Sequence, residues 1–154
     1  MQLTGNATQD GTIVFELGRL SLNSNFKKIL ILEDDHFSQR LFDKIISENL
    51  EGITPLFAEN CTDAQLALVR NEGIQLGILD IYLDEGKTGL DLYRHCLKKR
   101  NWQIPLIVTS AISEGELSEL VGTDVPMPIF LKKPFRPDYC AALIKSILNQ
   151  EIRT

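Results

Sequence analysis

The stretch "ILILEDDHF", from Ile29 to Phe37, places four aliphatic residues directly before three acids. A continuous apolar run of this kind predicts a strand that is buried on both faces of a parallel sheet. Three carboxylates at the end of a buried strand repel one another and lose hydration, which is costly unless an opposite charge compensates them. The stretch therefore predicts a cation beside Glu33, Asp34 and Asp35.

Strand-like and helix-like segments alternate along the rest of the chain. Four further apolar runs predict strands: "ITPLFA" (53–58), "LGILDIYL" (76–83), "IPLIVTSA" (104–111) and "PIFLKKPF" (128–135). Helical spacing of apolar residues follows every strand, from residue 37 and over 61–73, 89–100, 113–121 and 136–151. Five strands that alternate with five helices predict an α/β fold, with a doubly wound, five-stranded parallel sheet.

Local patterns place several of these segments more closely. Pro55 cannot donate a hydrogen bond to a neighbouring strand, which predicts that residues 53–58 form an edge strand. Phe37, Leu41 and Ile45 recur four residues apart, and we expect all three to face the core. Gly73 is a typical stop for the helix before it.

The first 26 residues differ from the rest, and we expect two parts: an N-terminal extension or linker over 1–26 and a folded domain over 27–152. In the extension, "NATQDG" (6–11) is typical of a turn, "TIVFEL" (12–17) of a strand and "SLNSN" (21–25) of a linker. A docked hairpin, an arm and a remnant of a neighbouring domain all fit this pattern.

Composition narrows the class of protein. Of 154 residues, 44% are hydrophobic and 24% are charged, which is typical of a globular domain. The net charge of −5 argues against direct binding of nucleic acid. We expect no membrane association, because no apolar run reaches the roughly 20 residues of a membrane span. Cys61, Cys96 and Cys140 lack metal-ligand spacing and predict reduced thiols in a cytoplasmic protein.

The carboxyl ends of the predicted strands carry most of the chemistry. In doubly wound sheets ligands bind at this edge. Carboxylates converge there from the first and third strands, a hydroxyl from the fourth and an ammonium group from the fifth: Glu33, Asp34, Asp35, Asp80, Thr109, Ser110, Lys132 and Lys133. Clustered carboxylates favour Mg2+ (or Mn2+), a hard cation that takes oxygen ligands and often bridges to phosphate. Lysine and hydroxyl groups would bind the phosphate oxygens, so the set predicts phosphoryl chemistry.

The chain resembles the CheY-like receiver domain of two-component response regulators, over about residues 27–152. Four motifs carry the resemblance in the right order: "ILILEDD", "ILDIYL", "IPLIVTSA" and "FLKKPF". The resemblance implies a flavodoxin-like fold with strand order 2-1-3-4-5. It implies that Asp80 accepts a phosphoryl group, that Lys133 and Ser110 contact that group, and that Phe130 is a switch aromatic. Lys132 and Thr109 would point away from the site.

The resemblance also implies the metal ligands. Glu33 and Asp34 would be the acidic pair, with Asp80 and the backbone carbonyl of Tyr82 completing the protein ligands. Asp35 would be accessory, because it is a plausible N-cap for the helix that follows.

The implied function is that of a phosphoacceptor signalling module in a phosphorelay. A sensor histidine kinase or histidine phosphotransfer protein would donate the phosphoryl group in a Mg-dependent transfer. The chain would be no enzyme beyond catalysing its own phosphorylation and dephosphorylation. The surface of the fourth helix, fifth strand and fifth helix would then bind a downstream protein or a fused output domain, or form a homodimer. We expect a stand-alone receiver or part of a larger regulator or hybrid kinase.

Departures from the family pattern leave alternatives open. Asp84 replaces a common proline, Gly89 comes one residue late, and "SEGELSELVGTDVPMP" (113–128) is an unusual fourth helix region. One alternative is therefore a phosphorylation-independent, receiver-like interaction module. Another is an enzyme on a similar sheet, such as a dehalogenase-type phosphatase or a flavodoxin. A dehalogenase-type phosphatase would need an Asp-x-Asp motif after the first strand, and "EDDH" (33–36) lacks it. In a flavodoxin, the three acids at this place would repel the phosphate of the flavin.

Overall fold

Five parallel strands form the main sheet of the computed structural model, which describes residues 4–8, 11–14, 27–70, 73–83 and 88–153. The strands are β3 (Lys27–Leu32), β4 (Ile53–Ala58), β5 (Ile74–Asp80), β6 (Leu106–Ser110) and β7 (Ile129–Lys132). Their order is β4-β3-β5-β6-β7, which confirms the predicted order 2-1-3-4-5. Pro55 lies in the edge strand β4, as predicted.

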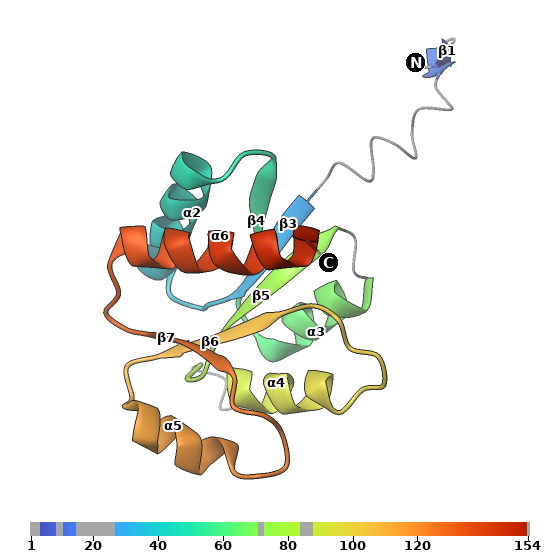
Figure 1. The fold of residues 1–154 in the computed structure, drawn as a ribbon. Helices are drawn as coiled ribbons and strands as arrows, with labels where there is room; N and C mark the ends of the chain where they lie inside the picture. The colour runs from blue at the N-terminus through green and yellow to red at the C-terminus, as the bar shows by residue number, and fades with distance from the viewer. Residues whose placement is uncertain (1–3, 9–10, 15–26, 71–72, 84–87, 154) are drawn as a thin grey trace.

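Five helices cover the sheet on its two faces (Figure 1). They are α2 (His36–Asn49), α3 (Cys61–Arg70), α4 (Gly89–Leu97), α5 (Glu114–Val121) and α6 (Pro137–Arg153). Helices α2 and α6 pack on one face, and α3, α4 and α5 pack on the other. The alternating strands and helices are the doubly wound arrangement that the sequence predicted.

The last four residues of strand β3 are buried because the strand lies between β4 and β5 under helices on both faces. Its side chains alternate: Ile29 and Ile31 face α2 and α6, while Leu30 and Leu32 face the other layer. All four are at most 1% exposed. Burial of one such side chain stabilises the fold by about 1.5–3 kcal/mol, so this strand fixes the position of the acids that follow it.

The prediction that Phe37 faces the core is wrong. Phe37 is 71% exposed, whereas Phe42 and Ile45 are buried. A helix turns by about 100° per residue, so Phe37 lies about 140° around α2 from Phe42. A spacing of four residues drifts away from the helical period, and the first turn of α2 therefore turns this ring to solvent.

The ends of several helices follow local sequence. Asp35 is the N-cap of α2, and its carboxylate accepts a hydrogen bond from the backbone N–H of Ser38 at 2.8 Å. Gly73, just after α3, has a φ of 84°, a left-handed conformation that favours glycine. Helix α4 ends at Leu97, three residues before its predicted end.

The N-terminal segment contains two short strands, β1 (Thr4–Thr8) and β2 (Gly11–Val14), which pair antiparallel as a separate two-stranded sheet. The predicted strand at "TIVFEL" is confirmed for Thr12–Val14. The predicted turn at "NATQDG" is wrong for residues 6–8, because pairing with β2 places them in β1. The predicted linker "SLNSN" lies outside the described residues. No helix among the residues that the structure describes is long and apolar enough to cross a membrane.

Candidate metal site at the carboxyl edge of the sheet

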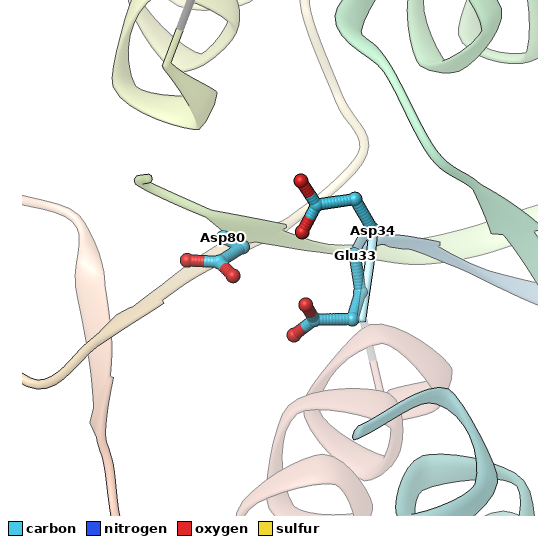
Figure 2. Close-up of side chains that lie close together, drawn as sticks. All are labelled: Glu33, Asp34 and Asp80. Atoms are coloured by element: carbon cyan, nitrogen blue, oxygen red, sulfur yellow. The ribbon is translucent and has the colours of Figure 1, made fainter. Parts of the chain in front are cut away.

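Three carboxylates meet beyond the ends of two neighbouring strands (Figure 2). Glu33 and Asp34 follow β3, and Asp80 is the last residue of β5. One oxygen from each lies within 4.8 Å of the others. Glu33 is 1% exposed and Asp80 is 6% exposed, so two of the three charges are removed from water. The sheet order therefore brings together three of the four acids that the sequence predicted to converge, without Asp35.

Lys133 supplies the positive charge beside these acids. Its Nζ donates to Oε1 of Glu33 at 3.0 Å and to Oδ2 of Asp80 at 3.2 Å. It follows β7, and the Lys133–Pro134 peptide bond is cis. One ammonium group, which follows the edge strand β7, thus bridges the acids of β3 and β5. Three carboxylates and one ammonium group leave the cluster with a net negative charge.

The pKa values reflect this shared environment. Burial raises the pKa of Glu33 above its ordinary value, the negative charge of Asp80 adds to this, and hydrogen bonds from the Asp35 N–H and Lys133 only partly oppose it. Burial acts to lower the pKa of Lys133, but attraction to Asp80 and Glu33 is stronger in sum and raises it. Lys133 therefore stays charged, and the buried glutamate carries an electrostatic cost that a divalent cation would relieve.

The backbone around Asp80 is closely packed. The N–H of Tyr82 donates to Oδ1 of Asp80 at 3.2 Å, which fixes the direction of the carboxylate. A Cβ atom on Gly89 would lie 2.1 Å from the carbonyl oxygen of Asp80. Only glycine fits at the start of α4, and sequence reasoning did not assign Gly89 this role. A glycine at the first position of an apolar-periodic helix was the signal that could have indicated it.

Ser110 ends β6 at the same edge, two strands away from the acidic pair. It is 2% exposed, and its Oγ accepts a hydrogen bond from the N–H of Ile112 at 3.3 Å. Within the described residues, no hydrogen bond donated by the Ser110 hydroxyl is found. A buried hydroxyl with an unused donor is costly, and an incoming oxygen atom would satisfy it.

Thr109 and Lys132 point away from the acids, as predicted. The Thr109 hydroxyl donates to the carbonyl of Leu131 at 2.7 Å inside the sheet. The Nζ of Lys132 donates to the carbonyls of Ala111 and Ile112. Phe130, on β7, is half-buried and packs against the core layer on the α3–α4–α5 side.

Neighbouring charged residues have other roles. Asp35 caps α2 and is fully exposed, which agrees with its predicted accessory place. His36 pairs with Glu59 through Nε2 at 2.9 Å on the surface. Asp84 lies outside the described residues.

The donor set fits a magnesium ion. Carboxylate oxygens are the ligands that Mg2+ prefers, and opposite ligands of an octahedral ion lie about 4.2 Å apart. The three carboxylates span a similar distance, so small side-chain movements would let them share one ion. The excess of negative charge over the single ammonium group also favours a cation.

Comparison with solved structures identifies the fold as one seen in receiver domains. The signal receiver domain of a signal transduction histidine kinase from Syntrophus aciditrophicus matches with a TM-score of 0.68 and 24% identity, over 83% of this chain and 94% of that one. This chain has the fold of a response-regulator receiver domain. A further receiver domain matches with a TM-score of 0.64 and 17% identity, over 80% of this chain and 98% of that one. It belongs to a sensor histidine kinase of Pseudomonas aeruginosa PAO1 and holds a magnesium ion in its active-site cleft.

Sequence comparison finds transcriptional regulatory proteins among the relatives of this chain. The transcriptional regulatory protein BaeR of Escherichia coli O6:H1 is 30% identical over 132 residues, which are 85% of this chain and 52% of that protein. The chain spans about half the length of the curated relatives it matches. No protein-family model matches it.

Proposed function

We propose that the chain is a phosphoacceptor module of a two-component phosphorelay, in which Asp80 receives the phosphoryl group. The observation that carries this proposal is the bridge from Lys133 to Asp80 and Glu33 beside a three-carboxylate cluster. A structural ion pair would need one carboxylate for one ammonium group. A cluster of three carboxylates, two of them bound by one lysine, at the edge where such sheets bind ligands, is better explained by metal and phosphoryl binding.

Glu33, Asp34, Asp80 and the backbone carbonyl of Tyr82 would hold a divalent cation, Mg2+ or Mn2+. When bound, the cation neutralises charge on the transferring phosphoryl oxygens. Lys133 would do the same, because its Nζ already donates to Oδ2 of Asp80 at 3.2 Å. Tyr82 directs the other oxygen, Oδ1, through its backbone N–H. Asp80 is therefore held in one orientation for attack, and catalysis here is positioning and charge neutralisation.

In the transfer step, an oxygen of the Asp80 carboxylate attacks phosphorus. The phosphorus–nitrogen bond of a phosphohistidine breaks, and the leaving imidazole keeps the electron pair and takes a proton from solvent. The product is an acyl phosphate on Asp80. Water later attacks phosphorus and releases phosphate, which restores the carboxylate. The chain would catalyse these two reactions on itself and no other.

Ser110 and Phe130 would link phosphorylation of Asp80 to the surface of α5, β7 and α6. The unused donor of the Ser110 hydroxyl would bind a phosphoryl oxygen, and the half-buried Phe130 ring would move with the β6–α5 loop. The surface of α5, β7 and α6 would then change its affinity for a partner. The partners would be a sensor histidine kinase or phosphotransfer protein upstream, and a downstream protein, a fused output domain or a second copy of this chain.

Beryllofluoride with Mg2+, a mimic of the phosphoryl group, tests the proposal without a partner kinase. We expect amide resonances of residues next to Asp80 and Ser110 to shift on its addition. Asp80→Asn should abolish these shifts. Asp43→Asn is the matched control, because Asp43 is an exposed aspartate on α2, and it should behave like the parent chain. Resonance shifts that persist in Asp80→Asn, or an absence of shifts in the parent chain, would contradict the proposal.

A further inference from the structure

A second lysine holds the β6–α5 loop, residues 111–113. Lys132 is the last residue of β7, and its Nζ donates to the carbonyl oxygens of Ala111 at 2.9 Å and Ile112 at 3.3 Å. Successive side chains of a strand point to opposite faces, so Lys132 reaches the loop from the face away from Lys133. The sequence predicted only that Lys132 points away from the acids and assigned it no contact.

One of these two peptide units, the Ala111–Ile112 unit, is also tied to Ser110. The N–H of Ile112 donates to Ser110 Oγ at 3.3 Å, while the carbonyl oxygen of Ile112 accepts from Lys132. The loop is thus held from both sides, by the hydroxyl of the proposed phosphoryl ligand and by an exposed ammonium group. Any movement of Ser110 toward a group on Asp80 would pull Ala111 and Ile112 away from Lys132 or force Lys132 to follow.

The other end of α5 is held differently. Arg94, on α4, donates to the carbonyls of Leu120 and Val121, the last residues of α5. A cation at a helix C-terminus also complements the helix dipole. The hydroxyl of the buried Tyr93 donates to the carbonyl of Pro126 at 2.9 Å in the segment that follows. The C-terminal end of α5 is therefore fixed through partly buried contacts, whereas the loop before α5 is held by an exposed lysine.

We propose that Lys132 is a positioning residue, a releasable tether that holds the Ser110 loop in its unphosphorylated position. The inference rests on the proposed phosphoacceptor function. The two Lys132 hydrogen bonds belong to the conformation that has no phosphoryl group, so removing them favours movement of Ser110 toward Asp80. With its C-terminal end fixed by Arg94, helix α5 then pivots about that end when the tether is released.

Amide hydrogen exchange tests the tether without metal or phosphoryl mimic. Lys132→Met keeps the length of the side chain and loses the donors, Lys132→Arg keeps charge and donors, and Lys99→Met is a control at an exposed lysine. We expect the Ile112 amide to exchange about twofold to tenfold faster in Lys132→Met, the factor that one or two exposed hydrogen bonds supply. Lys132→Arg and Lys99→Met should match the parent chain. Unchanged exchange at Ile112 in Lys132→Met overturns the tether.

The affinity for beryllofluoride with Mg2+ tests the coupling to the proposed function. Lys132→Met should bind the mimic about twofold to tenfold more tightly than the parent chain, and Lys132→Arg should restore the parent affinity. Equal or weaker binding by Lys132→Met overturns the coupling even if exchange at Ile112 is faster. Failure of the parent chain to bind the mimic overturns the proposed function and the coupling together, and the exchange experiment still decides the tether by itself.

Discussion

Replacement of Lys133 by methionine is the sharpest test of the electrostatic account. Its Nζ lies 3.0 Å from Glu33 and 3.2 Å from Asp80. At an effective dielectric constant of about 20, each attraction is about 5 kcal/mol before desolvation is subtracted. Loss of one partner from a fully buried pair destabilises a protein by about 3–5 kcal/mol. Because the Lys133 side chain is 27% exposed, we expect a loss of about 2–3 kcal/mol in the free energy of unfolding.

Urea unfolding in a metal chelator and in excess Mg2+ gives the assay. The Lys133→Met variant should lose stability in chelator and regain part of it in Mg2+, because the cation would replace the missing ammonium charge. Mg2+ should also stabilise the variant more than the parent chain, since Lys133 no longer competes for Glu33 and Asp80. Lys132→Met is the control and should show no such rescue. Equal stability of Lys133→Met and the parent chain in chelator would refute the reasoning.

Three further predictions concern the acids, the packing and a thiol. Asp34→Ala should abolish Mg2+ binding in a calorimetric titration, while Asp35→Ala should keep the binding and lose some stability, because the cap of α2 is removed; equal losses of affinity would contradict the assignment. Gly89→Ala should destabilise the fold by roughly 2 kcal/mol or more, because its Cβ would clash with the backbone of Asp80. Gly115→Ala in α5 should be neutral or stabilising in thermal unfolding, because its Cβ would make only an ordinary contact with Ser113 Oγ at 3.9 Å. Burial raises the pKa of Cys140 from 9.0 to about 12, so above pH 9 the unfolded chain releases a proton that the folded chain keeps. Stability should therefore fall with rising pH, and Cys140→Ala should reduce that slope by about 1.4 kcal/mol per pH unit; identical slopes would count against it.

The sequence predicted the fold and the meeting of acids and a lysine at one edge of the sheet, because both follow from the order of strands along the chain. Once "ILILEDD", Asp80 and the lysines before Pro134 are assigned to parallel strands, the carboxyl ends of those strands must meet at one edge. The bridge from Lys133 to Glu33 and Asp80 joins residues that are 100 and 53 positions apart, and the order of strands alone brings them together.

Some features that depend on local shape or on a side-chain rotamer were not predicted. Phe37 was misassigned because a four-residue spacing only approximates the helical period. The need for glycine at position 89 arises from the close approach of α4 to the backbone of Asp80 in β5, which the apolar pattern of a helix does not report. The contacts of Lys132 with the loop carbonyls depend on the rotamer of a long side chain, and no sequence pattern reports that.

Incubation with a small phosphodonor tests the central claim most directly. Acetyl phosphate and Mg2+ should add the mass of one phosphoryl group to the intact chain, and fragmentation after reductive trapping of the acyl phosphate should locate it at Asp80. Asp80→Asn and the parent chain in chelator should gain no mass, while Asp43→Asn should be modified like the parent. A parent chain that stays unmodified, or one that is modified at a residue other than Asp80, would contradict the account.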